Sequence, residues 1–80
     1  MNTAQTIAVR IRQLCAQEGI TPNALSYRAA VPQSTIKSIL NGESSNPGIV
    51  TIKKLCDGLD ITLKNFFDSP LFTDLEQEIQ

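Results

Sequence analysis

Two short helical stretches separated by only a few residues constrain the fold of this chain more than any other feature of its sequence. The first stretch runs from Pro22 to about Ala29, and Thr21 before it is a good N-cap because its hydroxyl can accept from the first helical turn. The second stretch begins at Pro32, carries its isoleucines on one face, and stops at Asn41-Gly42. Two helices joined by so tight a turn are typical of a helix-turn-helix, which we expect at the centre of the fold.

Helical spacing of apolar residues also precedes and follows this motif, so the fold is predicted to be all-α. The polar stretch from Glu43 to Gly48 has no hydrophobic residue and is a loop. The three helices expected outside the motif run from Thr3 to Glu18, from roughly Ile49 to Gly58, and from Leu63 to Phe67. The stripe predicted to be buried along the fourth helix comprises Ile49, Ile52, Leu55, Cys56 and Leu59. These elements predict one compact five-helix domain over residues 1–68.

Residues 69–80 form an acidic tail whose structure the sequence leaves open. Thr73 and Glu76 are spaced as in a capping box, so a short sixth helix beginning there and a non-helical tail are equally compatible with the pattern. This end of the chain also has more apolar side chains than a small domain needs to bury there. They are Phe66, Phe67, Leu71, Phe72, Leu75 and Ile79. Either they form a contact between subunits or they fold back onto the first helix.

The charges of the chain are divided between the helical domain and the tail. All seven basic residues precede Phe67, where only four acidic residues oppose them, and the other four acidic residues follow it. The net charge of −1 therefore combines a cationic domain with an acidic tail. A cationic domain is compatible with a nucleic-acid partner, because contacts to phosphate need Lys and Arg.

The residue inventory argues against enzymatic, metal-binding and membrane functions. There is no histidine, no CxxC pair and no glycine-rich phosphate loop, so no catalytic site, metal or cofactor is expected. Cys15 and Cys56 are expected to be buried, reduced thiols rather than a disulfide. No apolar run approaches the roughly 20 residues of a membrane span, and Met1 to Gln5 lacks a signal-peptide pattern. We therefore expect a cytoplasmic protein with no membrane association.

The polar face of the second motif helix is the strongest candidate for a binding surface. It contains no acidic residue and comprises Gln33, Ser34, Lys37, Ser38 and Asn41. Gln can form two hydrogen bonds to adenine, Lys can reach guanine or a phosphate, and Ser can donate or accept at a base edge. Such residues are also ordinary on a solvated helix face. Their position in a helix-turn-helix is what favours DNA.

Three runs of sequence, taken together, resemble one family of bacterial regulators. They are IAVRIRQLCAQEGIT, ALSYRAAVPQSTIKSILNG and IVTIKKLCDGLDITLKNFF. Over Ile7 to Phe67 the chain is similar to the phage repressor and Cro-like regulators of the XRE type. The resemblance implies a five-helix, repressor-like domain in which the second and third helices read double-stranded DNA.

The resemblance also implies roles for individual residues. Gln33, Ser34 and Ser38 fall where the family reads base edges, and Lys37 lies on the same face. The family contacts phosphates through the start of the second helix and the loop after the third. The matching residues of this chain are Thr21, Asn23, Ser44, Ser45 and Asn46.

The chain departs from the family near these expected contacts. Pro22 replaces a frequent polar residue, often Gln, and Glu43 stands where Lys or Arg is common. An acidic side chain beside phosphates weakens binding unless it points away, so we expect weak non-specific binding and a greater need for dimerisation. Arg10 is expected to have a structural role, and Tyr27 and Arg28 to be surface residues rather than DNA contacts.

Other departures lie inside the fold. Cys15 and Leu40 stand where many relatives pair Arg with Glu, so an apolar contact is expected to replace an ion pair. Ala30 and Asp60 stand where glycine is usual. Each must therefore adopt a costly left-handed conformation or change its turn.

These observations predict a small transcriptional regulator, expected to be a repressor, that reads an inverted repeat in the major groove as a homodimer, at least on DNA. It would be cytoplasmic and associated with the nucleoid when bound. The alternative is an antitoxin-like or anti-repressor module that uses the same fold to hold a protein partner. The acidic tail and Glu43 favour that alternative.

Overall fold

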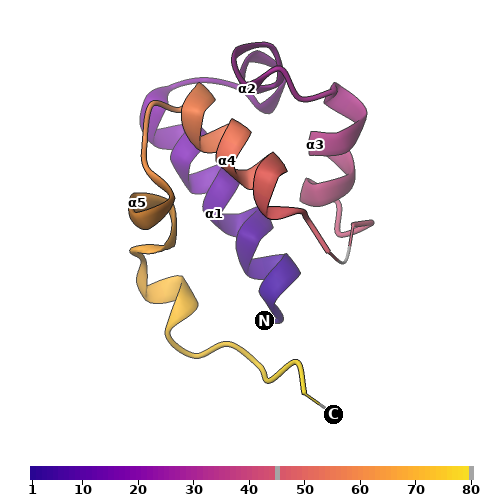
Figure 1. The fold of residues 1–80 in the computed structure, drawn as a ribbon, viewed down its shortest axis with the longest axis vertical. Coiled ribbons are helices and arrows are strands. Elements are labelled where there is room, and N and C mark those ends of the chain that lie inside the picture. The colour runs from indigo at the N-terminus through magenta and orange to yellow at the C-terminus, as the bar shows by residue number, and fades with distance from the viewer. Residues whose placement is uncertain (45, 80) are drawn as a thin grey trace.

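Residues 1–44 and 46–79 are described by a computed structural model in which five α-helices and one short 3-10 helix follow one another (Figure 1). The elements are α1 (Thr3–Glu18), α2 (Pro22–Ala29), α3 (Gln33–Leu40), α4 (Ile49–Gly58), α5 (Leu63–Phe67) and η1 (Pro70–Phe72). These bounds confirm the all-α fold and its five predicted helices. Within the described ranges no residue lies in a strand, and no helix is long and apolar enough to cross a membrane.

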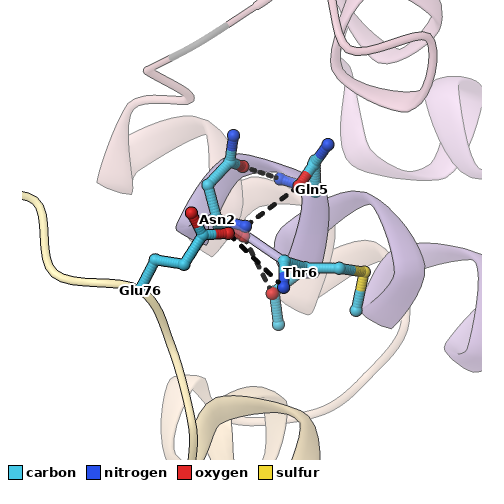
Figure 2. Close-up of polar contacts among 5 residues, drawn as sticks. Asn2, Gln5, Thr6 and Glu76 are labelled. Carbon is cyan, nitrogen blue, oxygen red and sulfur yellow. Dashed lines mark hydrogen bonds and ion pairs between the residues drawn. The ribbon is translucent and has the colours of Figure 1, made fainter.

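Side-chain caps explain where three of the helices begin. At α1 the Asn2 side chain accepts from the Gln5 N–H at 2.8 Å, and the Gln5 side chain accepts from the Asn2 N–H at 2.9 Å (Figure 2). Thr21 caps α2 and Thr62 caps α5, each through its hydroxyl and a backbone N–H three residues later. These acceptors satisfy N–H groups that have no partner within the helix.

Four helices end in the same motif, which needs one residue in a left-handed conformation. In this motif the N–H after the left-handed residue donates to a carbonyl five residues earlier, as Val31 does to Ser26 at 3.1 Å. The left-handed residues are Gly19 (φ 66°), Ala30 (φ 53°), Gly42 (φ 75°) and Asp60 (φ 58°). Of the two alternatives that the sequence left open, Ala30 and Asp60 therefore adopt the left-handed conformation rather than a different turn.

The apolar faces of the helices meet in one core. Its fully buried members include Ile11, Leu25, Ile39, Leu55 and Phe66. Cys15 is part of this core and Leu40 packs against it, so apolar groups occupy the place of the ion pair common in relatives. Both cysteines are free and buried, as expected, and burial raises the pKa of both thiols.

A close approach between α2 and α4 holds the helix-turn-helix against the rest of the fold. A Cβ atom on Gly58 would lie 3.0 Å from both the Cβ and the backbone N of Ala29. Gly58 therefore leaves the room that lets these two helices touch.

The prediction that α4 buries five residues along one stripe is wrong for one of them. Ile49 is 58% exposed, whereas the other four residues of that stripe are buried. Helix α2 packs near the end of α4, where Gly58 touches Ala29, and the first turn of α4 lies beyond that contact. Periodicity identifies the apolar face of a helix but not how far a neighbour covers it.

The short helix considered at Thr73 does not form, and η1 lies just before it instead. The Ser69 hydroxyl accepts from the Leu71 N–H at 3.3 Å, and Pro70 occupies the first helical position. These two residues begin the turn earlier than the capping-box pattern predicted. Thr73 ends η1 and caps no helix.

Aromatic contacts fold the beginning of the tail back onto the helical domain. Phe72 packs against the core, with its ring centroid 6.2 Å from that of Phe66 and 5.1 Å from that of Phe67, and η1 contacts α1. Further along, a carboxylate oxygen of Glu76 lies 3.5 Å from the amine of Met1 (Figure 2). The tail thus runs past the beginning of α1.

Candidate nucleic-acid interface

Helix α3 presents its predicted polar face to solvent. Its two isoleucines are buried, whereas Gln33, Ser34 and Lys37 are exposed and Ser38 is half-buried. A short helix with one buried and one polar face can lie on the core and still reach a ligand along its length.

A groove of about 400 Å³ separates the start of α2 from α3. Its lining residues are Pro22, Asn23, Gln33, Ser34, Ile36 and Lys37. The structure therefore brings together two predicted base-reading residues, Gln33 and Ser34, with Lys37 and with Asn23, a predicted phosphate contact from the neighbouring helix. Tyr27, one turn after Asn23 on α2, is 78% exposed, in keeping with a surface position.

A second groove, of about 350 Å³, lies between α3 and the segment that leads into α4. Its lining residues are Ser34, Thr35, Ser38, Ile39, Ser44, Asn46, Pro47, Gly48 and Thr51. Ser34 lines both grooves, and Ser44 and Asn46 are predicted phosphate contacts. Thr35 and Thr51 were not predicted from the sequence. Thr51 belongs to α4 and reaches this groove only through the packing of the folded chain.

Backbone N–H groups add hydrogen-bond donors for an anion near the second groove. In the part of the chain that the structure describes, no side chain caps α3 or α4, whose N-cap residues are Pro32 and Gly48. Uncapped N–H groups of a first helical turn suit an anion such as a phosphate. Gly48 itself lines the groove.

Three residues predicted to contact DNA, namely Thr21, Asn41 and Ser45, are not among the described residues that line the two grooves. The Thr21 hydroxyl accepts from the Ala24 N–H at 3.1 Å as the cap of α2, which leaves its own hydrogen to donate to a ligand. Asn41 is exposed at the end of α3 and is not among the lining residues of either groove. Ser45 lies outside the described residues.

Glu43 turns toward α3 rather than away from it. Its backbone N–H donates to the Ser38 carbonyl at 2.9 Å, and its side-chain Oε2 accepts from the Ser38 hydroxyl at 3.4 Å. The acidic residue that departs from the family pattern therefore lies beside the polar face of α3.

Two basic residues serve the fold. Arg10 donates through Nε to the Phe66 carbonyl at 2.7 Å and through its guanidinium to the Asn65 carbonyl at 2.8 Å, which ties α1 to the end of α5. This confirms the structural role expected for Arg10. Lys53 pairs with Asp57 one turn along α4. Lys37 is the cation on the polar face of α3.

Comparisons with known proteins point to the same part of the chain. Residues 10–69 match a family model described as a Cro/C1-type HTH DNA-binding domain. The fold is similar to a crystal structure of the prophage Lp1 protein 11, with 32% identity and a TM-score of 0.81, and the match covers 94% of this chain and 100% of that one. No curated protein matches the chain. The matched range includes every residue that lines the two grooves.

Proposed function

Because the chain belongs to the Cro/C1-type helix-turn-helix DNA-binding domain family, we propose that it is a small transcriptional regulator that represses by binding an inverted repeat in double-stranded DNA. The observation that supports this most is the exposed polar face of α3, which lies between two grooves lined by groups suited to bases and phosphates. Occupying the operator would exclude other proteins from it.

In this proposal α3 enters the major groove of DNA. Gln33 forms two hydrogen bonds to an adenine, through N6 and N7, while Ser34 and Ser38 contact neighbouring base edges. Lys37 reaches a guanine or a phosphate, and Asn41 contacts DNA at the end of the helix. All five residues lie on the face of α3 that the core leaves open.

Phosphates are proposed to occupy the two grooves that flank α3. On one side they meet Asn23, which lines the groove, and Thr21 beside it. On the other side they meet Ser44, Asn46 and the N-terminus of α4. Ser45 belongs to the same segment as Ser44 and is proposed as a further contact. Such contacts set the register of α3 without reading sequence.

We expect two copies of the chain on one operator. A single small domain makes few base contacts, and two copies about one DNA turn apart add their binding energies. Apolar side chains exposed on the monomer include Ile49, Val50 and Ile79. Phe66 is buried and Phe72 packs against the core, so these two aromatics are used within the subunit.

The experiment that tests the proposal is selection of binding sites by the full chain from a random pool of double-stranded DNA at low salt. The expected result is a symmetric motif with half-sites about 10 base pairs apart, bound by two chains in analytical ultracentrifugation. Failure to enrich any symmetric motif would reject the proposal. Because the proposed target is genomic DNA, a fluorescent fusion of the chain should localise to the nucleoid within the cytoplasm.

A protein-interaction module of antitoxin-like or anti-repressor type is the second candidate. Glu43 beside α3 favours it, and so does a cleft of about 480 Å³ lined by apolar groups from α1 and α4 together with Glu78. Co-purification with one stoichiometric partner, and no retention on DNA at low salt, would decide for this candidate.

A further inference from the structure

The turn that ends α3 holds Glu43 against the polar face of that helix. Gly42, with a φ of 75°, reverses the chain, and the N–H groups of Glu43 and Ser44 both donate to the Ser38 carbonyl, at 2.9 and 3.2 Å. The backbone of Glu43 is thus positioned by α3 itself. From there its Oε2 atom lies 3.4 Å from the Ser38 hydroxyl.

This contact, which is long for a hydrogen bond between a hydroxyl and a carboxylate, favours one of the two roles that the Ser38 hydroxyl can take beside a base. A serine hydroxyl has one hydrogen to donate and two lone pairs that accept, and the hydrogen rotates to suit its partner. An ionised carboxylate can only accept. Because Ser38 donates its hydrogen to Glu43, the two side chains together present only acceptors to a ligand beside α3.

We propose that Glu43 is a specificity-determining residue that, through Ser38, restricts one base position of each half-site to a base whose amino group lies in the major groove, which means cytosine or adenine. In the major groove cytosine N4 and adenine N6 are donors, whereas guanine O6, guanine N7 and thymine O4 are acceptors. The acceptor pair formed by Glu43 and Ser38 repels guanine and thymine, whose groups at this edge are acceptors as well. The inference rests on the proposed function and sharpens it, because Ser38 alone leaves the base open.

Cytosine fits this acceptor pair better than adenine. Adenine carries the N7 acceptor beside its amino group, and N7 would repel a carboxylate, whereas the major-groove edge of cytosine offers only a donor. The negative charge of Glu43 also disfavours phosphates at every sequence. Glu43 therefore makes binding more selective, because it weakens binding to sites with guanine or thymine at this position.

The test compares sites selected from a random double-stranded pool by the wild-type chain, Glu43→Gln and Ser38→Ala. In Glu43→Gln the new amide can donate to Ser38, which frees the hydroxyl to donate to a base. Preference for an amino-bearing base at one position of each half-site should then fall about tenfold, while the other positions keep theirs. Enrichment of cytosine or of adenine in the wild type shows which amino group is read.

Two further variants separate this role from a general effect of charge. Asp68→Asn removes the same charge directly after α5, across the fold from α3, and should leave the motif unchanged (Figure 1). Both neutralising variants can raise non-specific affinity, but only Glu43→Gln should steepen the salt dependence by up to about one counterion per subunit. The double variant Glu43→Gln with Ser38→Ala should select the same motif as Ser38→Ala alone.

The outcomes distinguish the two proposals. A symmetric wild-type motif that Glu43→Gln leaves unchanged overturns the role of Glu43 and leaves the proposed function standing. A wild-type position occupied by guanine or thymine, and lost in Ser38→Ala, overturns it as well. Absence of any wild-type motif overturns both.

Discussion

Ala30 carries backbone strain at the turn of the helix-turn-helix. A left-handed conformation costs an alanine of the order of 1 kcal/mol that a glycine does not incur. Ala30→Gly should therefore raise the free energy of unfolding by about 0.5 kcal/mol, since the greater freedom of the unfolded glycine offsets part of the gain. Denaturant titration followed by circular dichroism measures this change.

The control for that prediction is Ala16→Gly, the same chemical change at an exposed position of α1. Because Ala16 is in ordinary helical conformation, this variant should lose about 1 kcal/mol. Equal losses in both variants would mean that the left-handed turn is not strained.

Gln33 and Lys37 should respond differently to truncation. Gln33→Ala removes a proposed two-bond contact to a base, so it should cost roughly 1 to 3 kcal/mol on the selected operator and relax its sequence preference. Lys37→Ala, if Lys37 contacts a phosphate, should weaken binding to all sequences and flatten the salt slope by about one counterion. Fluorescence titrations over a range of salt measure both quantities, and a uniform loss across sequences for Gln33→Ala would contradict its role.

For individual residues, the sequence predicted which side chains are polar and exposed better than it predicted what those side chains contact. Gln33, Ser34 and Lys37 were found from periodicity, because burial of one helix face is a local pattern. The contact of Glu43 with Ser38 depends on the path of the turn after α3, and Thr51 reaches the groove only through tertiary packing. Neither is encoded by spacing along the chain.

The contact between α2 and α4 is the element-scale feature most sensitive to mutation. Gly58→Ala would place a Cβ atom 3.0 Å from the backbone N of Ala29, which cannot yield as a flexible side chain would. The two helices must separate, so the variant should lose about 1 to 3 kcal/mol of stability in a denaturant titration. Operator affinity should fall as well if α2 tilts.

The matched control is Gly48→Ala. No atom lies within 4 Å of a Cβ built on Gly48, and its φ of −68° is open to any residue. Stability should therefore change by less than about 0.5 kcal/mol. A loss as large as that of Gly58→Ala would show that helix contact is not the cause.

Helix bounds were predictable because stop and start signals are local. Gly19, Pro22 and the Asn41-Gly42 pair act through backbone conformation that needs no partner. The tail was not predictable in the same way. Two capping patterns compete there within a few residues, and the aromatic contacts of Phe72 favour the earlier one.

The molecule as a whole should show a simple dependence of stability on pH. The chain has no histidine, so no side chain of ordinary pKa titrates near neutrality, and stability should be nearly flat from about pH 6 to about pH 8. Burial raises the pKa of both thiols in the folded state, so the folded chain holds those protons more tightly than the unfolded chain. The free energy of unfolding should therefore fall as the pH rises through the ordinary thiol pKa, roughly 8.5.

Denaturant titrations at a series of pH values measure this dependence. Cys56→Ala should be less stable at neutral pH because it removes a buried side chain, yet its stability should fall less steeply in alkaline solution. Identical slopes for the wild type and the variant would assign the alkaline decline to other groups.

The left-handed alanine and aspartate also bear on how this protein can evolve. Alanine and aspartate codons each become glycine codons by a single nucleotide change, so Ala30 and Asp60 are one mutational step from relief of their strain. Neither residue lines the grooves beside α3. A lineage that acquires a destabilising substitution in α3 while adopting a new operator can thus regain stability at a site that does not touch DNA.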